Sequence, residues 1–211
     1  MATHTHHLTR LPDHWATISK VARWAFPPLL FWLAFLPRAI YPVARSTIWH
    51  FRAKAFIQAI VERDWAATLL APHPGVPTMW LVGIANRLGE VFIPGFDSGL
   101  LAHRMAIEIL PLALVIALSI VLAYFLLRRL LDDTIATVGS LLLALDPFHI
   151  TISKTVHVDA LMSVFAMLSA LWLLTSLHSG GNRRWRDVIL SAIFAALALL
   201  SKSPALFLAP Y

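Results

Sequence analysis

Four ionisable side chains that could act together lie close in the sequence, between two long apolar runs. Asp146, Lys154, His157 and Asp159 all fall within the segment LDPFHITISKTVHVDALMSVF. A carboxylate at a membrane surface that water reaches is able to accept a proton from an attacking hydroxyl. A lysine or histidine beside it is able to neutralise the charge of a phosphate leaving group. Because ionisable side chains beside a bilayer are costly, this grouping predicts a functional site.

The two acids of this segment also have purely structural interpretations. Asp159 opens an apolar run, and an acid at a helix N-terminus is favoured by about 0.3–1 kcal/mol. Asp146 precedes Pro147 and could simply cap or end a helix. Lys154 lies five residues before Asp159, and this close cation favours a site over an isolated helix cap. The charges could equally do no more than pair with each other in a structural subunit.

Three further candidates lie elsewhere in the chain. Asp64 follows an amphipathic stretch and could instead be a solvated acid paired with Arg63 or another neighbour. His73 lies in a turn rich in proline and glycine, which holds side chains in place, although a lone histidine is weak evidence. Lys202 lies near the end of an apolar run and either snorkels to the interface or binds an anionic group.

The composition indicates a protein that is integral to a membrane. Hydrophobic residues make up 59% and charged residues 13% of the 211 residues, against about 45–50% and about 25% in soluble domains. The net charge of +6 is modest, and the basic residues lie beside apolar runs, so we expect no nucleic-acid partner. Anionic lipid headgroups or a phosphate-bearing substrate fit this charge better.

Several classes of chemistry are excluded by missing motifs. The chain has no cysteine, which excludes a disulfide framework, a thiolate zinc site and a thiol nucleophile. No Walker motif, GxGxxG, HExxH or GxSxG sequence occurs. We therefore expect neither a metal nor a cofactor.

The apolar runs predict an all-α, polytopic transmembrane bundle that occupies residues 21–211, after a polar cytoplasmic tail at residues 1–20. The first run, Trp24–Pro37, is shorter than the about 20 residues that a span needs. It spans only if Arg38 snorkels and the helix continues. The other four expected spans are 109–127, 134–151, 160–177 and a last one from about residue 188.

Residues 45–105 are expected to form an amphipathic outer loop. Apolar residues recur there at helix-like spacing, and the stretch is too charged to cross a bilayer. We expect this stretch to lie at the membrane interface. The apolar positions that define the expected face are Phe51, Ala55, Phe56, Ile60 and Val61.

The positions of the arginines predict the orientation of the bundle. One basic loop, with Arg128 and Arg129, follows the span 109–127, and a second, at residues 183–186, lies between the last two expected spans. Short basic loops of this kind are cytoplasmic. The turn 146–159 then faces the outer side, together with residues 45–105, because long loops translocate regardless of charge. An enzyme that acts at the outer face predicts that the outer loop packs over the turn 154–159, whereas a transporter predicts ionisable groups near the bilayer midplane.

Three blocks of the sequence resemble the bacterial branch of the GT-C superfamily of membrane glycosyltransferases. This branch is related to protein O-mannosyltransferases and to lipid A aminoarabinose transferases. The blocks are ERDWAATLLAPHPGVPTMWLVG (Glu62–Gly83), LDPFHITISKTVHVDALMSVF (Leu145–Phe165) and SAIFAALALLSKSPALFLAP (Ser191–Pro210).

The resemblance implies a polyprenyl-phosphate-linked sugar donor, a protein or lipid acceptor on the outer side, and inversion at the anomeric carbon. It implies that Asp64 is the carboxylate of the first outer loop and serves as general base. Lys154 and Asp159 match a basic residue followed five positions later by Asp, and Lys202 matches a lysine after the fifth helix. Asp159 would then orient Lys154 and the acceptor, while Lys154, His157 and Lys202 would bind the donor phosphate. The protein would be a multi-pass protein of a prokaryotic plasma membrane.

The sequence departs from the family pattern in three respects. Members often carry an acidic pair just after the first helix, where this chain reads YPVARSTIWH. They more often have Arg at the position of Lys154, and Lys lacks the bidentate fork of Arg. The family fold has more helices than are visible here, so we expect the N-terminal part of a GT-C fold. The alternatives are a transporter or flippase-like protein that binds a lipid phosphate without catalysis, and an inactive fragment.

Overall fold

The computed structural model describes residues 13–40, 47–69 and 74–208, with side chains from residue 24 onward. Within these ranges the chain forms eight α-helices and two short 3-10 helices and has no strand, which confirms the expected all-α class. The elements are α1 (Asp13–Ala39), α2 (Thr47–Glu62), η1 (Ala66–Thr68), α3 (Val76–Phe92), α4 (Leu101–Leu130), α5 (Asp133–Leu145), α6 (Pro147–Ser153), α7 (Asp159–His178), α8 (Gly181–Ser201) and η2 (Ser203–Leu208).

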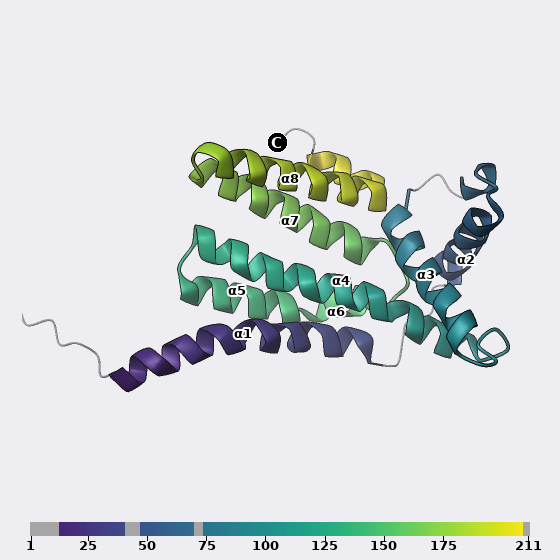
Figure 1. Ribbon diagram of the computed structural model, residues 1–211, viewed down its shortest axis with the longest axis horizontal. Helices are drawn as coiled ribbons and strands as arrows, with labels where there is room; N and C mark the ends of the chain where they lie inside the picture. The colour runs from purple at the N-terminus through teal and green to yellow at the C-terminus, as the bar shows by residue number, and fades with distance from the viewer. Residues whose placement is uncertain (1–12, 41–46, 70–73, 209–211) are drawn as a thin grey trace, which may run out of the picture.

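Five helices lie lengthwise in a bundle: α1, α4, α5, α7 and α8 (Figure 1). α4 is the central helix because it packs against α1, α5 and α7, and α7 in turn makes its most extensive contact with α8. α2 and α3 pack on each other at one end of the bundle, where α3 also contacts α4 and α8. One cluster of buried apolar side chains runs through this arrangement and includes residues of α1, α2, α4 and α7.

Two of the described helices are long and apolar enough to cross a membrane, α4 with 30 residues and α7 with 20. Their apolar runs confirm the second and fourth expected spans, 109–127 and 160–177. α4 ends at Leu130, just after Arg128 and Arg129, whose positive charges favour a helix C-terminus. Both helices have about half of their most apolar stretch buried inside the bundle, so the remaining surface is available to lipid.

The expected third span, 134–151, is broken into α5 and α6, which are bent by 48° at Asp146. Pro147 causes the break, because its ring lacks an N–H donor and clashes with the carbonyl of the preceding turn. The Asp146 side chain accepts a hydrogen bond from the Phe148 N–H (3.0 Å) and thereby caps α6. The prediction of a continuous helix was wrong here, although α5 and α6 together pass the same length and composition test as one bent span.

The first and fifth expected spans do not meet this test within the described part of the chain. α1 begins at Asp13, so the expected polar tail is helical from that residue onward. α8 has 21 residues, but its first turns carry Arg183, Arg184, Arg186 and Asp187, which leaves a short apolar run. Both helices nevertheless pack lengthwise, α1 on α4 and α8 on α7.

Arg38 does not snorkel, contrary to expectation. Its side chain is fully buried and donates from Nη1 to the carbonyls of Ala34 (2.7 Å) and Ala144 (2.8 Å), and from Nη2 to that of Leu143 (3.4 Å). Because α5 ends at Leu145, its last carbonyls have no partner within the helix, and a cation stabilises that terminus. The break in the third span therefore accounts for the burial of Arg38.

The apolar positions of α2 that define the expected interfacial face are only partly buried within the bundle. Phe56 is buried, but Phe51 and Val61 are 59% and 54% exposed. A Cβ on Gly83 of α3 would lie 2.9 Å from the Ala53 carbonyl oxygen, so this glycine lets α2 approach α3 closely on another face. The buried residues of α2 are Trp49, His50, Ala53, Phe56 and Ala59.

Candidate functional site

The two basic loops lie at the same end of the bundle, as their predicted common orientation requires. Arg129 at the end of α4 donates from Nη2 to Oδ2 of Asp187 in α8 (2.6 Å) and to Oγ of Ser179 after α7 (3.2 Å). We refer to this end as the arginine end. The C-terminal ends of α4 and α7 therefore lie at the same end of the bundle. The start of α7 lies at the opposite end, beside α2 and α3 (Figure 1).

The expected contact between residues 45–105 and the turn 154–159 is present at this opposite end. The ring of Trp49 in α2 meets that of His157 edge to face, with centroids 6.1 Å apart. The Gly75 N–H donates to the Ser201 carbonyl (3.2 Å), which joins the start of α3 to the end of α8. The first contact brings residues 45–105 against the turn 154–159, and the second brings them against the end of α8.

Three of the expected site residues meet there and form what we refer to as the Asp159 cluster: Asp159, His157 and Lys202. Lys202 Nζ donates to Oδ1 of Asp159 at 2.6 Å, and His157 Nδ1 lies 3.1 Å from Oδ2. The side chains of Asp159 and Lys202 are 38% and 28% exposed, so the cluster is open to solvent. It combines a carboxylate, which is able to accept a proton, with two basic groups that contact it.

The cluster forms because α7 and α8 are antiparallel and joined by a short turn. Asp159 is the first residue of α7, where an acid is favoured by the helix dipole. Lys202 follows the last residue of α8, and its N–H still donates to the Ala198 carbonyl (3.0 Å). A helix of 20 residues followed by one of 21 brings these two positions together.

Lys154 is not the partner of Asp159, which corrects the expected pairing. Its backbone N–H ends α6 by donating to the Ile150 carbonyl (3.1 Å), and its side chain is half-buried. Among the described residues no carboxylate pairs with its ammonium group. Lys202 takes the predicted place of Lys154 at Asp159 because the fold brings in a residue 43 positions away.

The other predicted residues lie apart from this cluster. Asp64 is exposed, and its Oδ1 accepts a hydrogen bond from the Ala67 N–H (3.1 Å), so it caps the short helix η1. No contact joins Asp64 to Asp159 in the part of the chain that the structure describes. His73 lies outside the described residues. Within those residues, no three His, Asp or Glu side chains are placed so as to hold a metal ion.

Asp146 lies near a second polar group, which the sequence did not reveal. Arg38 Nη2 lies 3.2 Å from Nδ1 of His149, and His149 Nε2 lies 3.1 Å from Oγ of Ser163. Because arginine only donates, Nδ1 of His149 is the acceptor and Nε2 carries the proton that it donates to Ser163. Asp146, His149 and Ser163 line a cavity of about 220 Å³ whose other walls are apolar.

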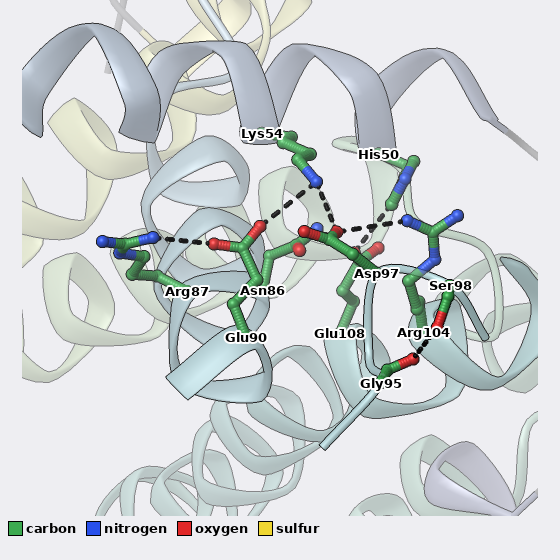
Figure 2. A network of polar contacts seen from close by, with 10 residues as sticks. All are labelled: His50, Lys54, Asn86, Arg87, Glu90, Gly95, Asp97, Ser98, Arg104 and Glu108. Carbon is green, nitrogen blue, oxygen red and sulfur yellow. Dashed lines mark hydrogen bonds and ion pairs between the residues drawn. The ribbon is translucent and has the colours of Figure 1, made fainter. Parts of the chain in front are cut away.

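A third polar group joins α2, α3 and α4 and was also missed. Figure 2 shows His50, Asn86 and Glu108 meeting inside the helices. His50 Nδ1 and Asn86 Nδ2 lie 2.7 and 2.5 Å from the same oxygen, Oε1 of Glu108. All three side chains are essentially inaccessible to solvent. The one signal in the sequence was Glu108 itself, an acid directly before the uncharged run 109–127.

Above this buried group, surface ion pairs attach the loop before α4 to α2 (Figure 2). Lys54 Nζ lies 2.6 Å from Asp97 and 3.1 Å from Glu90, while Arg104 lies 3.5 Å from Asp97. The hydrogen bond from Lys54 holds the pKa of Asp97 below its usual value, and the same bond raises the pKa of Lys54. Both groups are therefore charged over the whole neutral range, which keeps the loop on α2.

Comparison with known proteins identifies a family. The model of the dolichyl-phosphate-mannose-protein mannosyltransferase family matches residues 100–211, which is 112 of the 211 residues. This range contains two of the three blocks quoted above and the whole Asp159 cluster.

One relative among the curated proteins supports the same assignment. An 86-residue segment, 41% of this chain, is 36% identical to "Putative mannosyltransferase YkcB" of Bacillus subtilis (strain 168). The matched segment covers 12% of the length of that protein. No solved structure matches the chain.

Proposed function

The chain belongs to the dolichyl-phosphate-mannose-protein mannosyltransferase family, and from this premise we propose that it transfers a sugar from a polyprenyl-phosphate donor to a hydroxyl acceptor. The acceptor is a protein or lipid on the outer face of a prokaryotic plasma membrane, and the anomeric carbon is inverted. The Asp159 cluster is the observation that carries the proposal, because it joins a carboxylate to Lys202 and His157 at one open end of a membrane bundle.

The chemistry needs a proton acceptor and a stabilised phosphate. The acceptor hydroxyl oxygen forms a bond to the anomeric carbon as the bond from that carbon to the phosphate oxygen breaks. The polyprenyl phosphate leaves with the electron pair, and the hydroxyl proton passes to a carboxylate. A single displacement of this kind inverts the carbon. Lys202 and His157, which contact Asp159, and Lys154, which lies five residues before it, are the basic groups that stabilise the charge on the leaving phosphate.

Two carboxylates divide the remaining roles. Asp159 orients Lys202, as their 2.6 Å contact supports, and presents its free lone pairs to the acceptor. Asp64 is the general base of the outer loop. The exposure of Asp64 supports this role, because a base must reach an acceptor that arrives from solvent.

The transporter alternative draws on the broken third span, since broken helices often line ion and substrate sites. Arg38 is the buried cation beside that break. Its two terminal nitrogens already contact three carbonyls and His149, so they are committed within the protein. The cations of the Asp159 cluster are open instead, at the end of the bundle, and this favours catalysis at the surface.

The test is transfer of a radiolabelled sugar from polyprenyl-phosphate donors in membranes that contain the chain, alone and with any sequence encoded directly downstream. Asp159→Asn and Lys202→Gln are compared with Asp132→Asn. Asp132 caps α5 at the arginine end by accepting from the N–H groups of Thr134 and Ile135. Asn caps helices as well as Asp does, so this control removes a carboxylate without removing its structural role.

We expect Asp159→Asn to lower the turnover number by about 10²-fold, because the carboxylate that orients Lys202 and the acceptor is lost, and Lys202→Gln to raise the KM for the donor. Asp132→Asn should transfer at the wild-type rate. Full transfer by Asp159→Asn, at equal protein level, would contradict the proposed site. Binding of the donor without transfer from any of the forms tested would favour the transporter alternative instead.

A further inference from the structure

A hollow of about 290 Å³ lies at the arginine end, at the opposite end of the bundle from the Asp159 cluster. Its lining residues are Arg129, Arg183, Arg186 and Asp187, and we refer to it as the basic hollow. Neither the proposed transfer reaction nor the family match assigns a role to it. Three arginines around a single acid make it a concave, positively charged surface.

One arginine of the basic hollow is held rigidly. Arg129 donates to both oxygens of Asp187, at 2.6 and 3.4 Å, and to Ser179, and its guanidinium lies 5.4 Å from the centre of the Trp172 ring. Asp187 is 1% exposed and also accepts from Ser179 Oγ (2.9 Å). An arginine fixed in this way loses little conformational entropy when it binds a further group.

The acid does not cancel the charge of the other arginines. Burial favours a higher pKa for Asp187, but hydrogen bonds from Arg129 and Ser179 and the charges of Arg129 and Arg186 outweigh it and hold the pKa below its usual value. Asp187 is therefore ionised and engaged with Arg129. Arg183 and Arg186 are exposed and have no ion-pair partner among the described residues, which leaves two guanidinium groups facing outward around the hollow.

The hollow lies at the C-terminal ends of the two helices that are long and apolar enough to cross a membrane. α4 ends at Leu130 and α7 at His178, and these two helices are the ones whose length and apolar character suit a membrane span. The Arg129–Asp187 contact joins the end of α4 to the first turns of α8. Headgroup phosphates of the adjacent leaflet are therefore within reach of arginine side chains at this end.

We propose that the basic hollow binds the phosphate of an anionic glycerophospholipid and thereby anchors the arginine end of the bundle to the membrane surface. Arginine forms paired hydrogen bonds to phosphate oxygens, which an ammonium group cannot do in the same geometry. The positive end of the α8 dipole adds to the attraction. This binding is separate from sugar transfer and holds whether or not the transfer proposal is correct.

The experiment measures lipid binding to the purified full chain in mixed detergent micelles by native mass spectrometry. Phosphatidylglycerol is titrated against phosphatidylcholine, and a parallel series adds glycerol 3-phosphate as a soluble phosphate ester. The variants are Arg183→Gln and Arg186→Gln, each compared with Arg184→Gln. Arg184 is also exposed but does not line the hollow. Its substitution by Gln therefore removes the same charge from the start of α8 without changing the lining of the hollow.

We expect wild type to retain phosphatidylglycerol in preference to phosphatidylcholine. Arg183→Gln and Arg186→Gln should each weaken this binding about fivefold, which corresponds to about 1 kcal/mol for a basic residue at an anionic surface. Arg184→Gln should weaken it less than either of these variants does, because Arg184 does not line the hollow. The three arginines are exposed, so we expect each variant to fold. An unchanged melting temperature would show this.

Three results would overturn the proposal. Equal retention of both lipids by wild type would show that no anionic site exists. Equal losses from all three arginine variants would show diffuse attraction instead of a defined hollow. Displacement of phosphatidylglycerol by glycerol 3-phosphate at equal concentration would assign the site to a soluble phosphate ester and not to a lipid.

Discussion

Glu108 offers the most direct test of how the α2–α3 end is held together. Its carboxylate is fully buried and accepts hydrogen bonds from His50 of α2 and Asn86 of α3 on a single oxygen. We predict that Glu108→Ala destabilises the protein by about 3–5 kcal/mol, the cost of breaking a buried pair by removing one partner. The variant would also release α2 from α4.

The magnitude follows from the groups that are left behind. Removing Glu108 leaves two buried polar side chains, His50 and Asn86, without the acceptor that they share. Each unsatisfied buried group costs about 1–3 kcal/mol, so the sum of about 2–6 kcal/mol is consistent with the cost of a broken pair. Glu108→Gln keeps an oxygen that both donors can share and replaces the other carboxylate oxygen with a buried NH2 group, so it should cost less than Glu108→Ala, about 1–2 kcal/mol.

The assay is equilibrium unfolding of the purified full chain in mild detergent by titration with sodium dodecyl sulfate, followed by circular dichroism. Glu90→Ala is the matched control. Glu90 also lies on the α2–α3 end and contacts Lys54 and Arg87 at 3.1 and 2.9 Å. Its side chain is more exposed, at 18%, and surface pairs contribute about 0–1 kcal/mol.

One result would refute this reasoning. If Glu108→Ala lowered the free energy of unfolding by no more than Glu90→Ala does, the buried contact would not stabilise this end of the bundle. Equal effects of Glu108→Ala and Glu108→Gln would contradict the narrower argument, because the shared amide oxygen would then contribute nothing.

Three other predictions follow from contacts described above. Gly75→Ala should destabilise the protein by about 1–3 kcal/mol and shift the fluorescence emission of Trp49. The reason is that φ of Gly75 is +56° and a Cβ there would lie 2.1 Å from the Trp49 ring. A variant as stable as wild type would show that the ring moves freely. Arg38→Met should cost about 3 kcal/mol or more in detergent unfolding, since it leaves the carbonyls of Ala144 and Leu143 unpaired, and a cost under about 1 kcal/mol would mean that water replaces the guanidinium. Asp187→Asn should be less stable than wild type above pH 3.8, the usual pKa of an Asp side chain. The difference in stability should vanish as the pH falls through the lower pKa that Asp187 has in the folded protein. The reason is that a carboxyl group with a depressed pKa stabilises the fold only while it is ionised. A difference in melting temperature that persists at the lowest pH would contradict this sign.

Much of the bundle could be predicted because apolar runs report membrane spans without knowledge of any partner. The runs 109–127 and 160–177 are uncharged over their whole length, and both form helices of the expected type. The break at Asp146 was half visible, since Pro147 indicated a cap, but the sequence did not show whether the helix would continue beyond it. The face of α2 was harder to predict because Ala53 and Gly83 determine it through a close approach of two helices.

The polar contacts were less predictable because they join residues far apart in the chain. Asp159 could be identified locally, but its partner Lys202 is 43 positions away, and Lys154 was the nearer candidate by sequence alone. Arg38 is 106 positions from Ala144, and the need for a cation there exists only once α5 ends early. His50 and Glu108 show the same limit, because helical spacing does not reveal which polar residue of a helix turns inward.

The buried position of Arg38 has a consequence for the order in which the bundle assembles. α1 is synthesised before α5, and its arginine satisfies carbonyls at the end of α5 that lipid could not. The broken third helix therefore depends for its insertion on a helix made about a hundred residues earlier. The family match begins at residue 100, so the matched segment leaves out α1 and its Arg38. A protein shortened to that segment should fail to integrate its third helix stably, even though every residue of the Asp159 cluster would be retained.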